Sequence, residues 1–257
     1  MGETLGAAAA LMRDHPRETM LPLLAIQAPL VIGTILVTIL LYNSVFADEV
    51  YPQGGLIGVR EGGAQAFAFT VVLAVGLVFG AVALAATIVS TGAAAQGKSL
   101  SVTEALDSAF ARLGGMLVLT AIFLVGAVLL ALLAGTNLLL AVAAGVAALY
   151  LTSRVAITYQ VYLLEGGGPV EALRSSWNRT PGHMLRLLGI ILVGATLVLL
   201  VGLLVPVFPE PGSMSREWRM AVDALLQILQ GGVAIPFVAF AHAAITLYYL
   251  RIREEPS

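Results

Sequence analysis

Arg154 is the only charged side chain inside a long apolar stretch of this chain. A charged group in lipid is costly, so such an arginine faces a partner, lines a watery cavity or extends its guanidinium to the membrane surface. Glu165 follows eleven residues later, near the same helical face. At ~1.5 Å per residue the two are about 16 Å apart, too far for a direct bond. A partner for Arg154 must therefore come from another helix, and the sequence leaves all three roles open.

His242 lies in the last apolar stretch of the chain. It can bind a proton or a polar substrate, but a hydrogen bond to a neighbouring helix is the more common role for such a residue. The other histidines, His15 and His183, are distant in sequence, and the chain has no cysteine. We therefore expect no metal site and no thiol chemistry. Because the spaced motifs of hydrolases, phosphate-binding loops and dinucleotide-binding folds are also missing, we expect no catalytic residues and no cofactor.

The composition indicates the environment that must position these residues. The chain is 59% hydrophobic and only 11% charged, whereas soluble domains contain about 25% charged residues. Its net charge of −2 gives no basic surface for nucleic acid. We therefore predict an all-α integral membrane protein, with the bilayer as solvent for most of the chain.

Charge-free windows locate the membrane helices, since each span needs roughly 20 apolar residues. We predict one membrane domain over residues 1–257, with an amphipathic cytoplasmic segment at 1–19 and six transmembrane helices. The six predicted spans are about 20–46, 65–90, 114–134, 138–164, 186–207 and 224–250. A glycine pair with helix-packing spacing, Gly76 and Gly80, is predicted to pack within the monomer.

Lysine and arginine counts in the short loops predict the orientation. The side that carries the N terminus has nine of these residues, and the opposite side has three. We therefore place the protein in the cell membrane with both termini in the cytoplasm. An even number of spans agrees with this placement, because it requires both termini to lie on the same side of the membrane.

One short element occurs twice. Residues 104–112 and 171–179 align without gaps and share Glu, Ala, Leu, Ser and Arg at five of nine positions, with Phe110 aligned to Trp177. Apolar residues in the first copy recur with helical spacing, and Ser101 with Glu104 forms a capping-box pattern. We predict short cytoplasmic amphipathic helices at 101–113 and 169–180, each lying at the membrane interface with its aromatic residue turned toward the lipid.

Both copies precede a membrane span, and each is predicted to end in helix breakers, Gly114-Gly115 and Pro181-Gly182. A weaker third copy is predicted near the N terminus, where one helical stripe contains Leu5, Ala8, Ala9 and Met12. The predicted fold is therefore three repeated units, each an interfacial helix followed by two spans.

The second copy and the C terminus carry a family resemblance. EGGGPVEALRSSWNRTPGHMLRLLG resembles a signature of the membrane domain attached to some glycerophosphoryl diester phosphodiesterases, and LYYLRIREE (residues 247–255) is similar to the end of its last span. The matching positions are Glu165, Gly166 to Gly168, Glu171 to Leu173, Ser176, Trp177, Arg179, Thr180, Gly182 and Arg251. The resemblance implies a six-span membrane domain, and the catalytic domain of such enzymes has no counterpart here.

Two functions fit these residues. One is a non-catalytic membrane module, that is, an anchor, scaffold or assembly subunit, with membrane lipids or a protein docked on residues 165–183 as partners. The other is a transporter or permease subunit for lipid-derived or amphiphilic molecules. The scarcity of charged residues inside the spans favours the module, because a path for polar solutes needs buried polar groups. The ligand, the partner and the oligomeric state are not encoded in any pattern that we identify.

Overall fold

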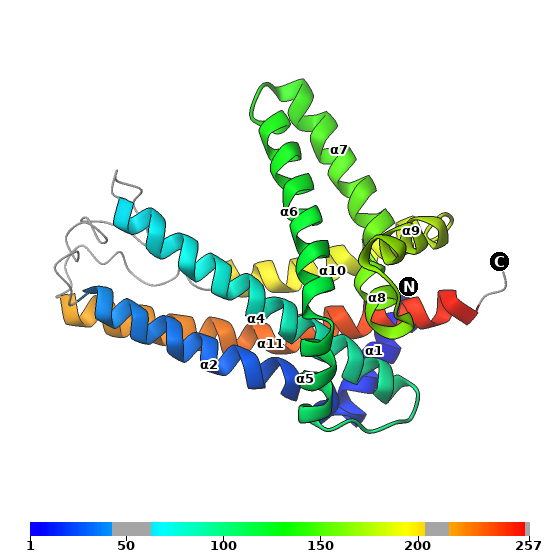
Figure 1. Cartoon of the computed structure of the whole chain (residues 1–257), viewed down its shortest axis with the longest axis horizontal. Helices are drawn as coiled ribbons and strands as arrows, with labels where there is room; N and C mark the ends of the chain where they lie inside the picture. Colours follow the sequence, from blue (N-terminus) through cyan, green and yellow to red (C-terminus); the bar gives the residue numbers. More distant parts are fainter. Residues whose placement is uncertain (43–62, 204–215, 255–257) are drawn as a thin grey trace.

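The computed structural model describes residues 1–42, 63–203 and 216–254 (Figure 1). Every regular element in these ranges is an α-helix, which confirms the predicted all-α class for this part of the chain. The helices are α1 (Gly2–Asp14), α2 (Pro16–Tyr42), α4 (Gly63–Ala95), α5 (Val102–Ala111), α6 (Leu113–Ala134), α7 (Leu138–Val155), α8 (Thr158–Glu165), α9 (Pro169–Arg179), α10 (Met184–Leu203) and α11 (Arg216–Glu254).

Within the described residues, five helical segments are long and apolar enough to cross a membrane. They are Pro16–Leu36, Ala74–Ala95, Leu113–Ala134, Leu138–Glu165 and Ala224–Glu254. A sixth is obtained when α9 and α10, which are bent by 113° at the break between them, are counted as one segment. The ends of two predicted spans, 43–46 and 204–207, lie outside the described residues.

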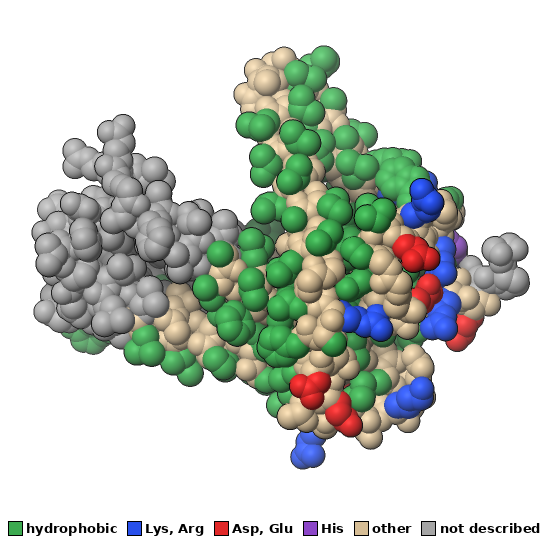
Figure 2. Space-filling model, viewed as in Figure 1, with side chains coloured by type: hydrophobic (Ala, Val, Ile, Leu, Met, Phe, Trp, Pro, Cys, Tyr) green, Lys and Arg blue, Asp and Glu red, His purple; other side chains and the backbone are tan. Residues whose placement is uncertain are grey.

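The long helices form two groups (Figure 1). Helices α2, α4, α10 and α11 run side by side, while α6 and α7 form a hairpin that contacts α4 and α10 and projects away from them at its tip. On the face shown in Figure 2, charged side chains gather around α1, α5, α8, α9 and the end of α11, and the hairpin tip is hydrophobic. Helix α1 and the end of α11 lie at the charged end, where Arg251 Nη1 donates to Glu3 Oε2 at 3.3 Å.

The predicted span 138–164 corresponds to the candidate span Leu138–Glu165, and its helix has a short break. Helix α7 ends at Val155 and α8 begins at Thr158, although neither Gly nor Pro occurs at the break. The hydroxyls of Ser176 and Thr180 donate to the Arg154 carbonyl at 2.9 and 3.3 Å. In a continuous helix this carbonyl would accept a hydrogen bond from the backbone N–H four residues later. Here the two hydroxyls from α9 and its C-cap donate to it instead, and the helix is interrupted.

The first predicted breaker, Gly114-Gly115, is wrong. Helix α5 ends at Ala111 and α6 begins at Leu113, so both glycines belong to the first turn of α6 and the chain turns at Arg112. The second breaker lies where the sequence places it, between α9 and α10, and Gly182 has φ +83° there. An L side chain rarely adopts this conformation, so glycine is required at that turn.

Two packing predictions also need correction. A Cβ on Gly76 or Gly80 would meet no atom within 4 Å, so these glycines make no close helix contact among the described residues. The buried part of α4 begins one residue later, at Ala81. In α1 the buried residues are Thr4, Ala8 and Met12, and Ala9 is exposed, because the helix contacts α11 and α2 along a stripe of period four.

Candidate functional site

Helix α8 lies where the two copies of the repeated element meet. Five of its eight residues are buried: Thr158, Gln160, Val161, Tyr162 and Leu163. The next two residues, Gly166 and Gly167, have φ +85° and +87°, so the chain reverses directly into α9. We call residues 101–116, which contain α5 and the start of α6, the first corner, and residues 168–187, which contain α9 and the start of α10, the second corner.

The first corner binds α8 through Arg112. Its Nη1 donates to the Tyr162 carbonyl at 2.6 Å, and the Tyr162 hydroxyl donates to the Arg112 carbonyl at 3.2 Å. The Tyr162 carbonyl is among the last four of α8, which have no partner within the helix, so Arg112 caps the C-terminal end of α8. Gly115 makes room for this contact, because a Cβ at that position would overlap the Tyr162 hydroxyl.

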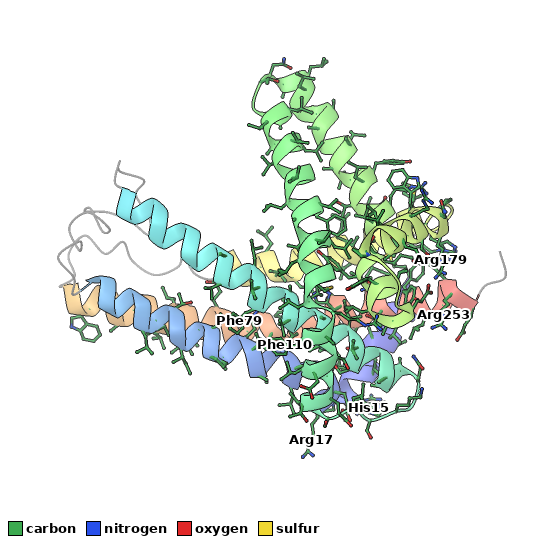
Figure 3. All side chains as sticks on the ribbon, in the orientation of Figure 1. His15, Arg17, Phe79, Phe110, Arg179 and Arg253 are labelled. Carbon is green, nitrogen blue, oxygen red and sulfur yellow. The ribbon has the colours of Figure 1, made fainter. Side chains whose placement is uncertain are left out.

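The second corner binds α8 through Arg179, which is aligned with Arg112. Its guanidinium forms an ion pair with the Glu165 carboxylate, and the Tyr249 hydroxyl donates to the same carboxylate oxygen at 2.5 Å. The side chains of Arg179 and Glu165 are 36% and 22% exposed, so the pair is partly screened by solvent. Arg179 and Arg253 extend at the same end of the molecule (Figure 3).

Helix α11 also holds the turn of the second corner. The Tyr248 hydroxyl lies 3.0 Å from His183 Nδ1, and the two rings meet edge to face with their centroids 5.9 Å apart. Consecutive tyrosines of α11 therefore contact the end of α8 and the α9–α10 turn. The two stretches of sequence that carry the family resemblance, around Glu165–Gly182 and around Tyr248–Tyr249, form one junction.

Arg154 has its partners on α9. Its Cζ lies 4.4 Å from the centroid of the Trp177 ring and 5.9 Å from that of Tyr150, and Nη1 is 3.5 Å from Thr180 Oγ1. Tyr150 and Trp177 meet edge to face with their centroids 6.0 Å apart. The guanidinium thus stacks on an aromatic pair, an arrangement that stabilises a desolvated cation. Its Nε is buried without a partner among the described residues.

The remaining predicted residues have separate roles. The Glu171 carboxylate accepts from the backbone N–H of Gly168 at 3.4 Å and caps α9, whereas Ser176 is fully buried and bonds to α7. His242 makes no hydrogen bond to another described residue, so the predicted bond to a neighbouring helix is not found. It lines a cavity instead, among mostly aliphatic side chains.

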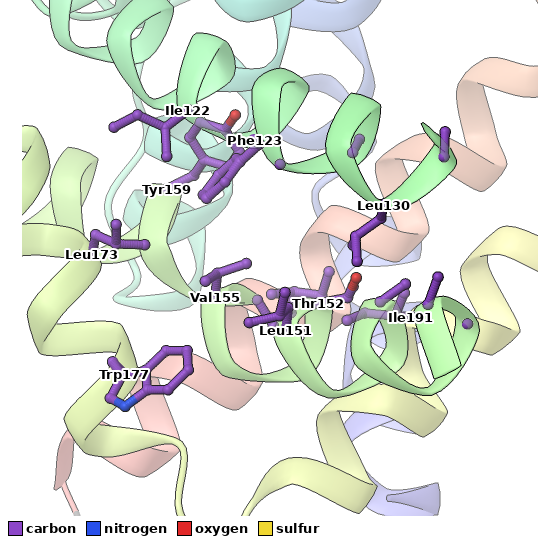
Figure 4. A pocket seen from close by; sticks show the side chains of 18 of the residues that line it. Ile122, Phe123, Leu130, Leu151, Thr152, Val155, Tyr159, Leu173, Trp177 and Ile191 are labelled. Carbon is purple, nitrogen blue, oxygen red and sulfur yellow. The ribbon is translucent and has the colours of Figure 1, made fainter. Parts of the chain in front are cut away.

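This cavity has a volume of about 930 Å³, within the roughly 300–1,000 Å³ typical of small-molecule pockets. It lies between the α6–α7 hairpin and the helices beside it (Figure 4). The hairpin contributes small residues that leave the space unfilled: Gly126, Ala127, Ala131, Ala134, Ala141, Ala144, Gly145 and Ala148. Leu173 and Trp177 of α9 close the end nearest α8.

Most polar groups of the cavity lie toward α8 and α9. Thr152, Tyr159, Gln160 and Trp177 come from the last turn of α7 and from α8 and α9, His242 comes from α11, and no Asp, Glu, Lys or Arg is among the described lining residues. Gln160 is only 2% exposed, and its Oε1 has no hydrogen-bond partner within the described ranges. A buried polar group left unpaired costs on the order of 1–3 kcal/mol, so the unpaired amide oxygen of Gln160 is unusual in this cavity wall.

Comparison of the chain with protein-family models, curated proteins and solved structures yields no match. The geometry is therefore the basis for a functional proposal. Among the described residues, no three His, Asp or Glu side chains come together to hold a metal ion.

Three important residues were not singled out from the sequence: Tyr162, Gln160 and Tyr249. Gln160 carried a usable signal, since an amide in a predicted span is uncommon. Tyr249 lies in LYYLRIREE, which carries part of the family resemblance, whereas Tyr162 carried no signal beyond its residue type; the partners of both could not be read from the sequence, because they are 84 and 50 residues away.

Proposed function

We propose that this protein is a non-catalytic module of the cell membrane, built from three units that each place an amphipathic helix before two membrane helices. The units are α1 with α2 and α4, α5 with α6 and α7–α8, and α9 with α10 and α11. In each unit the two long helices pack against each other. The observation that carries the proposal is the contact of both aligned arginines, Arg112 and Arg179, with the same short helix α8.

The two aligned helices also bury equivalent positions, which supports the repeat. Ala105 and Ala172 are 0% and 1% exposed, and the next position on the same face is Ala109 in α5 and Ser176 in α9. The aligned aromatic residues, Phe110 and Trp177, lie nearer the surface. Both helices therefore turn one face to the protein and offer the other to lipid head groups or to a docked partner.

The resemblance to the membrane domain of glycerophosphoryl diester phosphodiesterases fits this proposal. The stretches that carry it meet at α8, α9 and α11, on the end of the molecule that the arginine count assigns to the cytoplasm. We propose α9 as a fixed docking element. The hydroxyls of Ser176 and Thr180 anchor it to α7, and the ion pair with Glu165 anchors its C-terminal end to α8.

Single cysteines test the six-span arrangement, because the chain has no cysteine. We expect Ser108→Cys and Ser175→Cys, in α5 and α9, to react with a membrane-impermeant maleimide only after the cytoplasmic side is opened. Asn137→Cys, between α6 and α7, should react in intact cells. Labelling of positions 137 and 175 from the same side would contradict the proposed topology.

A photoreactive phenylalanine analogue at Val170 tests what covers the outer face of α9, since this residue is 65% exposed. An adduct with one protein of defined mass would identify an assembly subunit, and adducts with lipid alone would place α9 in the head-group layer. Val118 of α6, which is 46% exposed on a predicted span, provides the lipid-facing reference.

The cavity favours a second candidate, a permease for lipid-derived amphiphiles. Flux of a fluorescent lysolipid in liposomes that contain the purified protein separates the two functions. The module predicts no saturable flux. Saturable flux that Arg154→Ala abolishes and the exposed control Arg174→Ala preserves would replace the module with the permease.

A further inference from the structure

The cavity beside α8 is apolar at one end and polar at the other. Toward the hairpin tip its walls are alanine, glycine and leucine side chains, including Leu130, Ala134 and Ala141. Toward α8 and α9 it is lined by Tyr159, Gln160 and Trp177, and further polar groups come from Thr152 in the last turn of α7 and from His242 of α11. Such a gradient matches a molecule with one apolar chain and a small polar head, whose head would lie at the charged end of the protein (Figure 2).

The polar end selects an uncharged head group. No Asp, Glu, Lys or Arg occurs among the described residues that line the cavity, and its one histidine, His242, lies among mostly aliphatic side chains, so an ionised head placed there would have no fixed counter-charge. The Arg154 guanidinium lies over the ring of Trp177, which lines the cavity, and reaches Thr180, so it is already engaged in the protein.

The Gln160 amide determines which hydrogen-bonding group of a ligand fits the polar end of the cavity. Neither atom of its amide bonds to another described residue, and Oε1 is fully buried. Rotation of the terminal amide can therefore turn either its oxygen or its NH₂ toward the cavity at no loss of protein contacts. A hydroxyl is the complementary group, since it both donates to an amide oxygen and accepts from an amide N–H.

The hairpin gives a route to this site from the bilayer. Its outer residues are strongly exposed, among them Leu132 at 65% and Val146 at 63%, and these surfaces meet lipid if the hairpin crosses the membrane. The hairpin contacts α4 through α6 and α10 through α7, and its outer part extends away from these helices (Figure 1). A membrane-dissolved amphiphile can then enter sideways between the two groups of helices.

We infer that this cavity binds a single-chain amphiphile with an uncharged, hydroxyl-bearing head, a monoacylglycerol being the simplest example. The chain lies along the small residues of α6 and α7, and the head hydroxyl meets Gln160 beside Tyr159. The inference requires the chain to lie in a membrane, but it is independent of the choice between module and permease, because both can hold a bound lipid.

Tryptophan fluorescence tests the inference directly, because the chain has two tryptophans and only Trp177 is among the described residues that line the cavity. Trp218, which is 67% exposed in α11, is replaced by phenylalanine. The Trp218→Phe protein in phosphatidylcholine nanodiscs is titrated with a monoacylglycerol that is brominated on the acyl carbons next to the head group, because bromine quenches indole on contact and Trp177 lies at the head-group end. Brominated phosphatidylcholine is the second probe.

We expect saturable quenching by the monoacylglycerol at a mole fraction at least tenfold below that needed for brominated phosphatidylcholine. Gln160→Leu, which keeps the side-chain size and removes the amide, should raise the half-saturating mole fraction about tenfold. Gly126→Leu should abolish saturation, because its side chain fills the cavity and a Cβ there meets no atom within 4 Å.

Gly76→Leu is the matched control. A Cβ at this glycine also meets no atom within 4 Å, but Gly76 is not among the described residues that line the cavity, so its quenching curve should match that of Trp218→Phe. Thermal unfolding of each variant verifies that it is folded. Linear quenching that is equal for both probes, no quenching by either, or saturation unaffected by Gly126→Leu would each overturn the inference.

Discussion

The two corners start from nearly the same nine residues and turn in different ways. In the first, a single residue, Arg112, ends α5 and begins α6 with φ −109°. In the second, four residues from Thr180 to His183 separate α9 from α10, and the helices are bent by 113°. The two corners share three features: a glutamate that caps the helix, small buried residues, and a terminal arginine that contacts α8.

The two corners differ in the group on α8 that the arginine contacts. Arg112 binds a backbone carbonyl of α8, whereas Arg179 binds the Glu165 carboxylate, which Tyr249 of α11 also contacts. The first corner therefore depends on close packing of Tyr162 against Gly115, and the second on a partly exposed ion pair that joins three helices. Steric overlap in a packed interior costs more than loss of a partly screened ion pair, and this sets the order of the following predictions.

Gly115→Ala should have the largest effect, because its methyl group overlaps the Tyr162 hydroxyl. We expect a loss of about 1–3 kcal/mol in the free energy of unfolding, as for other overpacked sites. Thermal unfolding in detergent measures it. Gly114→Ala is the adjacent control, since a Cβ there meets no atom within 4 Å, and equal melting temperatures for the two variants would refute the packing account of the first corner.

Glu165→Ala should follow, with a loss of about 1–2 kcal/mol, because it leaves Arg179 and Tyr249 without their shared acceptor. Tyr249→Phe should account for only part of this loss. A double-mutant cycle of Glu165→Ala with Arg179→Ala gives the coupling of the pair. Additive losses would show that the second corner is not held by this contact.

Arg112→Gln should cost about 1 kcal/mol, since it removes a charged cap from the end of α8 but leaves the Tyr162 ring in place. Increased hydrogen exchange at the C-terminal end of α8 should accompany the loss. Arg174→Gln, on the exposed face of α9, is the control for removing a surface charge, and similar exchange in both variants would exclude the capping role.

The dependence of stability on pH should reveal the contribution of the Ser101–Glu104 cap in the first corner. The Ser101 hydroxyl and backbone N–H donate to Glu104 and hold the pKa of this carboxyl below its ordinary value of 4.5. Because the folded pKa is the lower one, the stabilisation is complete above pH 4.5 and decreases as the pH falls through the folded pKa.

Glu104→Gln should therefore flatten the acid limb of the stability curve, with the smallest effect of the four. The comparison is thermal unfolding between pH 6 and pH 3, with Asp107→Asn of the same helix as the control. An acid limb equally steep in Glu104→Gln and in the unaltered protein would mean that the cap does not contribute.

The sequence by itself determined the helices and their local ends. Charge-free windows predict α6 to within one residue, and the Ser101–Glu104 spacing predicts a capping box that the structure contains. These features depend on neighbours three or four residues apart and on the run of apolar residues, both of which can be read directly. The same reasoning placed the recurring Glu, the small buried residues and the terminal Arg in both corners.

Only the tertiary structure decided which groups meet. The break between α7 and α8 has no glycine or proline to announce it, and it depends on hydroxyls 22 and 26 residues away. The aromatic partner of Arg154, the contact of Tyr249 with Glu165 and the cavity beside α8 are all set by helices distant in sequence. Apolar runs predict that a helix is buried in lipid or protein, but the face it turns to each depends on the other helices that pack against it.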